Sequence, residues 1–276
     1  MFILEILKVI VLGIVEGITE WLPVSSTGHM ILLDELIRLD VSSEFYEMFL
    51  VVVQLGAILA VPILFYKRLN PFVKDAEERR TKIGLWGKVL VGSLPAAILG
   101  FLLDDLLDRY LYNYVVVSLS LIVYGVFFIF VEKSRAEKKT NIETVEALSY
   151  TDAIGIGVFQ ALSLIPGTSR SGSTILGGML IGASRNASAE FSFFMAIPIM
   201  LGASGLKIIK YLLGGFRASY LECVLLLLGI AVSFVVSLTV IKFLIDFVKK
   251  HDFKAFGYYR IILGMAVLVY FVLKKV

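Results

Sequence analysis

The sequence predicts an all-α integral membrane protein, with six transmembrane helices and two re-entrant helix pairs in an inverted-topology repeat. Three observations lead to this fold class. Hydrophobic residues make up 58% of the 276 residues and charged residues 18%, and the mean hydropathy is +0.89; a water-soluble fold cannot cover so much apolar surface. Six apolar windows have about the 20 residues that a membrane span needs. Two further apolar stretches are interrupted by proline and small polar residues.

The six windows lie between clusters of charged residues, as expected for helices that cross the hydrocarbon core. They are residues 45–66, 86–103, 114–131, 191–212, 221–245 and 257–273.

The two interrupted stretches are residues 1–38 and 153–184, broken at residues 23–29 and 166–172. Each half alone is too short to span a bilayer. Non-helical backbone at membrane depth is tolerated only where protein or a water-filled cavity satisfies its polar groups. We therefore expect each stretch to form a re-entrant helix pair whose tip lies in the interior, close to the other tip.

The basic residues predict the orientation. They are densest in the loop 67–88 and recur in the loops 133–139 and 249–254, whereas loops 104–113 and 213–220 carry fewer. The positive-inside rule places the first three loops in the cytoplasm. The first re-entrant pair then enters from the outer face and the second from the cytoplasmic face, which is the arrangement of an inverted repeat.

A short sequence echo supports a duplicated half. A Glu-Phe pair followed by Leu-Gly-Ala occurs at residues 44–57 and again, with identical spacing, at residues 190–203, each time after a broken stretch. We expect one polytopic domain over residues 1–276, built from repeats of approximately 1–112 and 113–276.

Several classes of protein are disfavoured by composition. Cys223 is the single cysteine, so no disulfide framework exists, and no Cys/His cluster has zinc-site spacing. The net charge of +3 is too small to indicate nucleic-acid binding. Glu5 and Lys8 interrupt the first apolar run, and we expect the first helix to belong to the fold and not to a cleaved signal peptide.

Glu16 and Glu20 are four residues apart, so a helix carries both carboxylates on one face, just before Pro23. Charged groups in lipid are costly, and intramembrane glutamates usually hold a proton, a partner or a cation. The alternative is a first helix that lies at the interface with both carboxylates in water. Trp21 and the flanking apolar residues favour a buried position.

The segment after Pro23 supplies three hydroxyls, from Ser25, Ser26 and Thr27, and the imidazole of His29. They begin a helix, whose free N–H groups and positive dipole end favour an anion. A plain helix cap would explain one hydroxyl but not the histidine. The other histidine, His251, lies in a charged loop and is expected at the surface.

Arg170 is the candidate phosphate ligand of the second broken stretch. It lies between Ser169 and Ser171 at the start of another helix, so a guanidinium, hydroxyls and backbone N–H groups converge. The planar fork of arginine pairs with two phosphate oxygens. The alternative is a structural ion pair with Glu16 or Glu20, and both roles are compatible if substrate displaces the pair.

Two glutamates near a bound phosphate group would repel it, so we expect a divalent cation, Mg²⁺ or Ca²⁺, on Glu16 and Glu20. The nucleophile is left open between Ser26, activated by His29, and His29 itself, which would form a phosphohistidine.

The segments E-G-I-T-E-W-L-P-V-S-S-T-G-H at residues 16–29 and P-G-T-S-R-S-G at residues 166–172 resemble the two signature regions of the bacterial undecaprenyl pyrophosphate phosphatases, the bacitracin-resistance proteins. The likeness extends over nearly the whole chain, including residues 184–193. It implies an inner-membrane, multi-pass enzyme that removes the terminal phosphate from undecaprenyl pyrophosphate, recycles the cell-wall lipid carrier and confers bacitracin resistance.

The resemblance also assigns residues. It implies function for Glu16, Glu20, Ser26, Thr27, His29 and Arg170, and more weakly for Ser169, Ser171, Gln54 and Arg260. The expected partners are the polyprenyl pyrophosphate and membrane lipid, with a homodimer left open, and the site is expected to open to the outer face. The second hypothesis is a flippase or transporter with a midplane phosphate site. His29 beside Glu and Ser favours hydrolysis, because transport needs no nucleophile.

Overall fold

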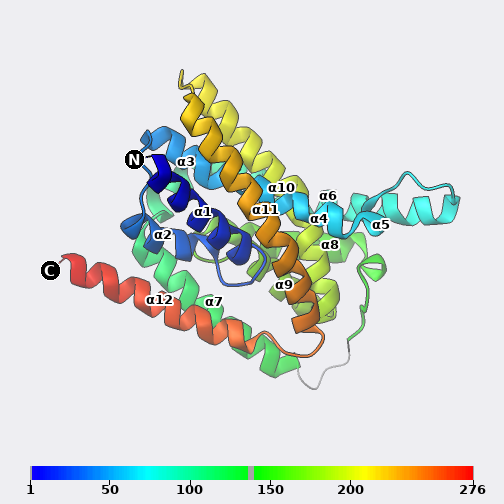
Figure 1. Ribbon diagram of the computed structural model, residues 1–276. Coiled ribbons are helices and arrows are strands. Elements are labelled where there is room, and N and C mark those ends of the chain that lie inside the picture. The colour runs from blue at the N-terminus through cyan, green and yellow to red at the C-terminus, as the bar shows by residue number, and fades with distance from the viewer. Residues whose placement is uncertain (1, 136–139, 276) are drawn as a thin grey trace.

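The computed structural model describes residues 2–135 and 140–275 and is all-helical in these ranges (Figure 1). Its helices, in chain order, are α1 (Phe2–Thr19), α2 (Ser26–Leu36), α3 (Ser43–Val52), α4 (Gln54–Leu64), α5 (Tyr66–Leu69), α6 (Ala76–Leu111), α7 (Tyr114–Arg135), η1 (Val145–Ala147), α8 (Tyr150–Ala161), η2 (Leu162–Leu164), α9 (Arg170–Ile181), α10 (Arg185–Leu213), α11 (Tyr220–Val248) and α12 (Lys254–Lys275).

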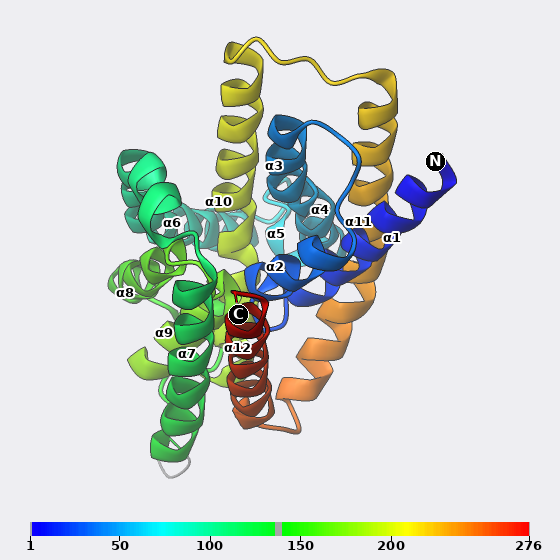
Figure 2. The same cartoon turned by 90° about the vertical axis from the view of Figure 1, so that its left-hand side faces the viewer.

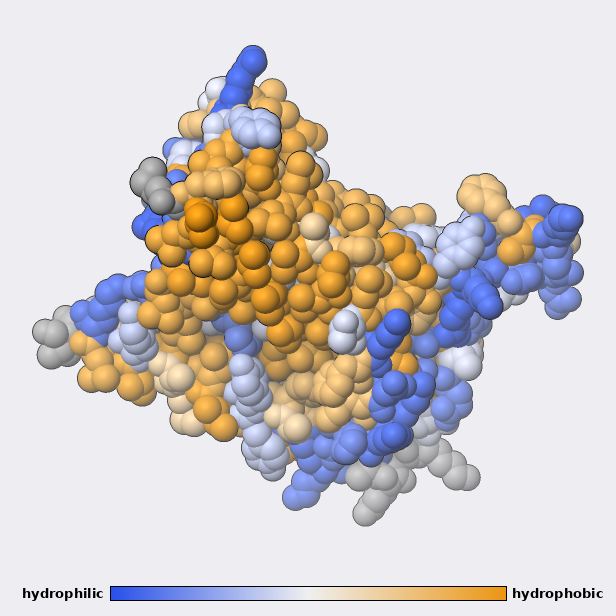
Figure 3. All heavy atoms as spheres, viewed as in Figure 1, coloured by the Kyte–Doolittle hydropathy of each residue, from blue (hydrophilic) through white to orange (hydrophobic). Residues whose placement is uncertain are grey.

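Six segments within the described residues are long and apolar enough to cross a membrane, as the sequence predicts. They are Ser43–Leu64, Ala76–Leu103, Tyr114–Arg135, Arg185–Leu213, Tyr220–Val248 and Lys254–Lys274. Large apolar side chains on these helices remain exposed, among them Phe101 at 73% and Leu227 at 65%. Figure 3 shows such residues covering the face formed by α10 and α11, with hydrophilic residues gathered at the edges. The protein is therefore a multi-pass membrane protein, with lipid as the solvent of this face.

The spans pack in two groups around the shorter helices. α7 lies along α12, and α11 lies along both α1 and α4. Figure 2 shows α10 and α11 joined across the top, with α7 and α12 side by side below α10. Helices in lipid associate through close backbone approach at small residues, because burial of apolar surface gives no driving force there. Gly157 of α8 follows this rule: a Cβ at this position would lie 2.0 Å from the carbonyl oxygen of Gly92 in α6.

Most helix starts have a local cause in the sequence. Ser42, Asp75 and Ser184 each accept a hydrogen bond from the backbone N–H three residues ahead, at the starts of α3, α6 and α10. Such caps satisfy N–H groups that have no partner inside the helix. Ser149 with Asp152, and Ser219 with Glu222, form complete capping boxes at the starts of α8 and α11.

Ion pairs tie the helix ends together on the side that carries the basic loops. Arg68 pairs with Glu190 at the start of α10, and its Nη2 donates to both carboxylate oxygens of Glu146, at 2.8 and 2.9 Å. The buried carboxylate of Glu132 on α7 accepts from Arg185 at 2.5 Å and from the backbone N–H of Phe253 at 2.8 Å. These contacts join α5, η1 and α10, and separately join α7, α10 and the start of α12.

Candidate active site

The two broken helix pairs come together in the interior of the molecule. The chain turns between α1 and α2 at residues 20–25, and between η2 and α9 at residues 165–169. Ser171 Oγ lies 3.3 Å from the carbonyl oxygen of Leu22, to which it donates. The sequence prediction that the two tips meet is confirmed by this contact.

Ser25 and Ser169 occupy matching positions at the two tips. Their φ angles are +72° and +74°, a region that residues other than glycine seldom adopt. Each hydroxyl accepts a hydrogen bond from a glycine N–H three residues ahead, Gly28 at 3.3 Å and Gly172 at 3.2 Å. The strained backbone, which costs about 1–3 kcal/mol per residue, is thus held by the cap of the following helix. Both helices then direct their N-terminal N–H groups into the interior.

Arg170 is the central cation of the site. Its Nη2 donates to Glu20 Oε1 at 2.7 Å, and its Nη1 donates to the carbonyl oxygen of Ser192 at 2.8 Å and to the Ser192 hydroxyl at 3.3 Å. The guanidinium also lies over the ring of Trp21, 5.5 Å from its centroid. The ion pair considered from the sequence therefore exists. The carboxylate and the indole hold the planar fork in one orientation.

Glu16 and Glu20 are both buried, with exposed fractions of 1% and 6%. Their side chains lie close enough to influence each other, and Ser26 lies close to Glu20. Among the described residues, Glu16 Oε1 has no hydrogen-bond partner. One guanidinium cannot neutralise two carboxylates, so a proton or a cation must compensate the second charge. The interfacial alternative, with both glutamates in water, is wrong for this structure.

The oxygen atoms at this point suit a hard cation. Among the described residues, Glu16 Oε1 lacks a hydrogen-bond partner, Glu20 lies close to Glu16, and Ser26 lies close to Glu20. Within the described residues, no group of three or more His, Cys, Asp or Glu side chains forms a complete protein metal cage. Mg²⁺ commonly takes one or two carboxylates and completes its shell with water and substrate phosphate. The residues present therefore fit such an ion.

His29 lies at the tip of the first pair with both ring nitrogens engaged. Its Nδ1 lies 2.7 Å from the carbonyl oxygen of Ser25, and its Nε2 lies 2.7 Å from the hydroxyl of Tyr259 on α12. A carbonyl can only accept, so Nδ1 carries the proton and the neutral Nε2 accepts from the tyrosine. The two rings are stacked, 5.6 Å apart. The structure thus pairs His29 with Tyr259, whereas Ser26 lies close to Glu20.

Arg260 links the two tips through their backbones. Its guanidinium is fully buried and donates to the carbonyl oxygens of Pro23 at 3.2 Å, Gly167 at 2.8 Å and Thr168 at 2.8 Å. It also lies over the ring of Tyr124, 5.6 Å from the centroid. Carbonyl groups freed by a helix break need a donor inside the membrane. Arg260 supplies it for both breaks at once.

The remaining predicted residues differ in how close they come to this centre. Ser169 Oγ lies 3.2 Å from Ser171 Oγ. Thr27 is half-buried in the first turn of α2. Gln54 begins α4, and in the described part of the chain no hydrogen bond joins it to Arg170 or to the glutamates.

Sequence reasoning missed Tyr259, Ser192 and Met200. Tyr259 directly precedes Arg260, and Ser192 lies in the segment 184–193, so position next to a recognised residue was the only signal. Met200 lies within an apolar span and contacts Arg170 through its sulfur, 3.7 Å from Nη2. Nothing in the sequence around Met200 indicates this contact.

Six candidate spans and a buried arginine–carboxylate centre define a multi-pass helical membrane protein with a charged site in its interior. The chain belongs to the family described as bacitracin resistance protein BacA, whose sequence model matches residues 9–266. It is 54% identical over 270 residues to the undecaprenyl-diphosphatase of Acetivibrio thermocellus, covering 97% of this chain and 98% of that protein. It is 52% identical to the undecaprenyl-diphosphatase of Desulfitobacterium hafniense, covering 98% of each chain. An undecaprenyl-diphosphatase of Enterococcus faecalis is 54% identical, with 96% of this chain and 97% of that one covered.

Proposed function

We propose that this protein is an undecaprenyl-diphosphatase, which hydrolyses undecaprenyl pyrophosphate to undecaprenyl phosphate and inorganic phosphate. The observation that carries the proposal is the arginine held at the junction of two helix N-termini beside two carboxylates. The identity of about half the residues with undecaprenyl-diphosphatases over nearly the full length supports it. In a bacterial cell the enzyme would work in the plasma membrane, where it would recycle the cell-wall lipid carrier and confer bacitracin resistance.

Arg170 would bind the pyrophosphate. In the free protein its Nη2 pairs with Glu20. A phosphate oxygen can take over this donor, while the contact of Nη1 with Ser192 keeps the guanidinium oriented. The N–H groups at the starts of α2 and α9, and the hydroxyls of Ser169 and Ser171, would complete the anion site. Phosphoryl transfer depends mostly on such positioning and charge stabilisation.

The proximity of Ser26 to Glu20 favours Ser26 as the nucleophile. Its oxygen would attack the terminal phosphorus while Glu20 accepts the hydroxyl proton. The bond from phosphorus to the bridging oxygen breaks, and undecaprenyl phosphate leaves. Water then hydrolyses the phosphoserine and releases inorganic phosphate. The rival nucleophile, His29 Nε2, would first have to give up its hydrogen bond from Tyr259.

Trapping separates the two nucleophiles. Rapid quench with a substrate labelled in the terminal phosphate should give an acid-stable phosphoenzyme if Ser26 attacks, and an acid-labile one if His29 attacks. Ser26→Ala should abolish the acid-stable product. Full activity in both Ser26→Ala and His29→Ala would contradict both mechanisms and point to direct attack by water.

Glu16 and Glu20 would hold a Mg²⁺ or Ca²⁺ ion together with substrate oxygens. The ion would neutralise the repulsion between carboxylates and pyrophosphate. The unpartnered Glu16 Oε1 supports this assignment. Added Mg²⁺ or Ca²⁺ should raise the melting temperature of chelator-treated protein in the presence of a pyrophosphate analogue, and Glu16→Gln should remove this effect.

We further infer an inverted repeat with two re-entrant pairs. The pairing of α1 with α11 matches that of α8 with α6, and Ser25 and Ser169 share an unusual backbone conformation at equivalent tips. Both features favour a twofold relation between α1–α2 and α8–α9. Under this relation α7 and α12 are equivalent helices, and they contact each other. Their equivalence moves the favoured boundary between the repeats from about residue 112 to a point after Arg135.

The same pseudo-symmetry supports a second candidate function, flipping of the lipid carrier, because inverted repeats are common in transporters. Purified protein in liposomes decides between the two. Release of phosphate from undecaprenyl pyrophosphate, lost in Arg170→Ala, supports the phosphatase. Movement of the lipid between leaflets without phosphate release would overturn it.

A further inference from the structure

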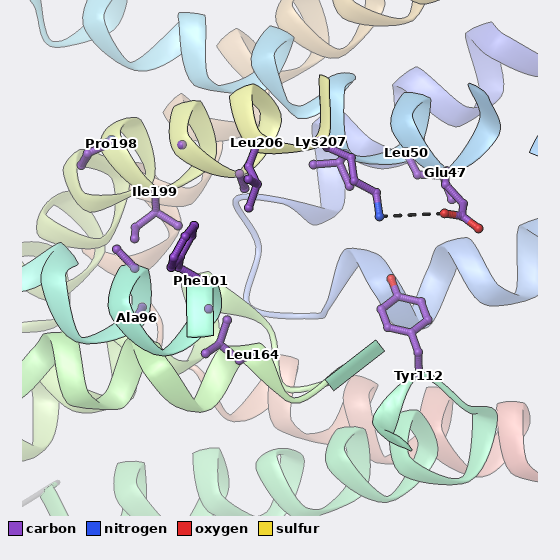
Figure 4. Close-up of a pocket in the computed structure, with 15 residues that line it drawn as sticks. Glu47, Leu50, Ala96, Phe101, Tyr112, Leu164, Pro198, Ile199, Leu206 and Lys207 are labelled. Carbon is purple, nitrogen blue, oxygen red and sulfur yellow. Dashed lines mark ion pairs between the residues drawn. The ribbon is translucent and has the colours of Figure 1, made fainter. Parts of the chain in front are cut away.

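A cavity of about 640 Å³ lies between α3, α6 and α10, apart from the charged centre (Figure 4). Its walls are mostly apolar and include Ala96, Phe101, Leu164, Pro198 and Leu206. The lining residues do not include Glu16, Glu20, His29 or Arg170. The volume is within the range of about 300–1,000 Å³ typical of small-molecule sites.

One end of this cavity adjoins the candidate active site. Pro198 and Ile199 line it, and the next residue of α10, Met200, contacts Arg170 Nη2 through its sulfur at 3.7 Å. Leu164 lines it from η2, two residues before the break at Pro166. A chain attached to a pyrophosphate on Arg170 would therefore begin beside this end of the cavity.

The opposite end of the cavity is polar. Lys207 Nζ lies 3.9 Å from Glu47 Oε2, and Tyr112 lies beside this pair (Figure 4). Met200 and Lys207 are seven residues apart on one helix, so the apolar part is roughly 10 Å long. A charged pair is an unfavourable neighbour for a long hydrocarbon chain. Such a chain would enter the apolar part and then leave sideways into lipid, past exposed residues such as Phe101.

Small residues open the space. Gly100 of α6 and Gly202 of α10 both line the cavity. A Cβ at Gly202 would have no heavy atom within 4 Å, and one at Gly100 would meet only the Leu164 side chain. The helices are therefore not in contact here, in contrast to the close approach of α8 and α6 at Gly157.

We propose that this cavity binds the isoprene units next to the pyrophosphate of the substrate, and that the rest of the prenyl chain lies in the bilayer. The proposal rests on the proposed phosphatase function and adds to it the site that recognises the chain. The apolar walls and the end next to Arg170 together match one amphiphile, a pyrophosphate joined to a branched hydrocarbon, and the polar far end limits how many isoprene units the cavity takes.

The test fills the cavity without touching the charged centre. Gly202→Leu places a side chain in the empty space. Gly205→Leu is the matched control, because its Cβ also meets nothing within 4 Å but Gly205 does not line the cavity. For each protein, kcat/KM is measured with a five-carbon and a fifteen-carbon prenyl pyrophosphate. Gly202→Leu should lower the preference for the longer chain by roughly tenfold or more, and Gly205→Leu should keep the wild-type preference.

An unchanged preference in Gly202→Leu, or an equal change in both variants, overturns the proposal. If wild-type protein hydrolyses neither compound, the cavity is judged by labelling alone, and the proposed function is judged separately by release of phosphate from undecaprenyl pyrophosphate. A prenyl pyrophosphate with a diazirine in its first isoprene units should label residues 96–101 and 198–206 of wild-type protein. Labelling of α2 or α12 instead overturns the proposal. Labelling that excess unlabelled prenyl pyrophosphate does not reduce also overturns it, because the cavity would then hold bulk lipid.

Discussion

Arg170 combines two roles that the sequence left as alternatives. It is paired with Glu20 in the structure, yet three further contacts, to Ser192, Met200 and Trp21, hold its guanidinium independently of that pair. Removal of one partner of a buried pair is costly, since the other charge is left uncompensated. A substrate phosphate that displaces the carboxylate keeps the guanidinium compensated, and the proposed cation would then compensate Glu20. The ion pair is therefore compatible with the proposed binding of pyrophosphate.

Arg170→Lys tests this role, because lysine keeps the charge and loses the planar fork. We expect kcat/KM to fall on the order of a hundredfold or more, a loss of about 3 kcal/mol of transition-state stabilisation. Melting temperature and turnover are measured on the same detergent-purified sample. Arg185→Lys is the control, since Arg185 pairs with Glu132 outside the site and its replacement should affect stability alone. A folded and active Arg170→Lys protein would rule out the phosphate role.

Tyr259→Phe tests whether the tyrosine positions His29. The substitution keeps the stacked ring and removes the hydroxyl that donates to Nε2. Loss of one hydrogen bond is worth about 1 kcal/mol, so turnover should fall several-fold. The chain has two histidines, His29 and His251, so nitrogen NMR can follow the tautomer of His29 directly. Tyr258→Phe, one residue earlier, should change neither. An unchanged His29 spectrum in Tyr259→Phe would exclude a positioning role.

Site residues could be predicted from the sequence where the side chain is unusual in a membrane span. They could not be predicted where the residue type is common in spans. Glu16, Glu20 and Arg170 stand out because charges in apolar segments are costly. Tyr259 and Met200 do not, since tyrosine and methionine are common in spans. The pairing of His29 with Tyr259 depends on the packing of α12 against α2, which no local pattern encodes.

At the scale of elements, the six spans follow from hydrophobic length and the two tips from proline and small polar residues. The sequence did not reveal that the span Ser43–Leu64 is divided into α3 and α4 at Val53. It also did not reveal which helices are neighbours, because α1 contacts α11 and α8 contacts α6 through glycines spaced far apart in the chain. Glycines also occur where no other group approaches, as at Gly84, Gly202 and Gly205, so the residue alone does not identify a contact.

Gly157→Ala tests the contact of α8 with α6. The added Cβ would lie 2.0 Å from the backbone oxygen of Gly92, so the helices must move apart. Overpacking of this kind costs about 1–3 kcal/mol, and we expect a clear drop in melting temperature. Gly84→Ala in α6 is the control, because its Cβ meets nothing within 4 Å and alanine favours helix. An equal melting temperature for the two variants would contradict the close contact.

Glu146 gives the ion pair at η1 a pH dependence. Burial raises the pKa of this carboxyl, but hydrogen bonds from its own backbone and from Arg68 outweigh burial and hold the pKa below its usual range. A lowered pKa contributes stability that is present above the unfolded value of about 4.3 and is lost as the pH falls through the folded value. Both side chains are about one-third exposed, so the effect is at most about 1 kcal/mol.

We therefore expect the melting temperature of wild-type protein to fall below about pH 4.5, and the fall to be smaller in Glu146→Gln. Glu77→Gln, which removes an exposed carboxylate from the first turn of α6, should leave the wild-type acid dependence unchanged. Identical acid profiles for wild type and Glu146→Gln would show that the pair adds no pH-dependent stability.

At the scale of the whole molecule, the proposed inverted repeat predicts on which face of the membrane the ends of α1 and α2 lie. If α1–α2 is re-entrant, the start of α1 and the end of α2 lie on one face of the membrane. If instead the two helices cross as one broken span, these ends lie on opposite faces. The positive-inside rule further requires that the face of α2's end be the outer one, with the loop before α6 in the cytoplasm.

Cysteine labelling distinguishes these arrangements. Cys223, at the start of α11, is exposed, and it should react with a membrane-impermeant maleimide from the outer face. In a Cys223→Ser background, Phe2→Cys and Asp40→Cys should both react from outside, and Lys74→Cys only after the membrane is opened. Reaction of Phe2→Cys and Asp40→Cys from opposite faces would exclude the re-entrant pair. Reaction of Lys74→Cys from outside would reverse the orientation. The expected pattern would mean that the tip carrying Ser26 and His29 enters the bilayer from the outer leaflet. A pyrophosphate released on the outer face could then reach Arg170 without first crossing the membrane.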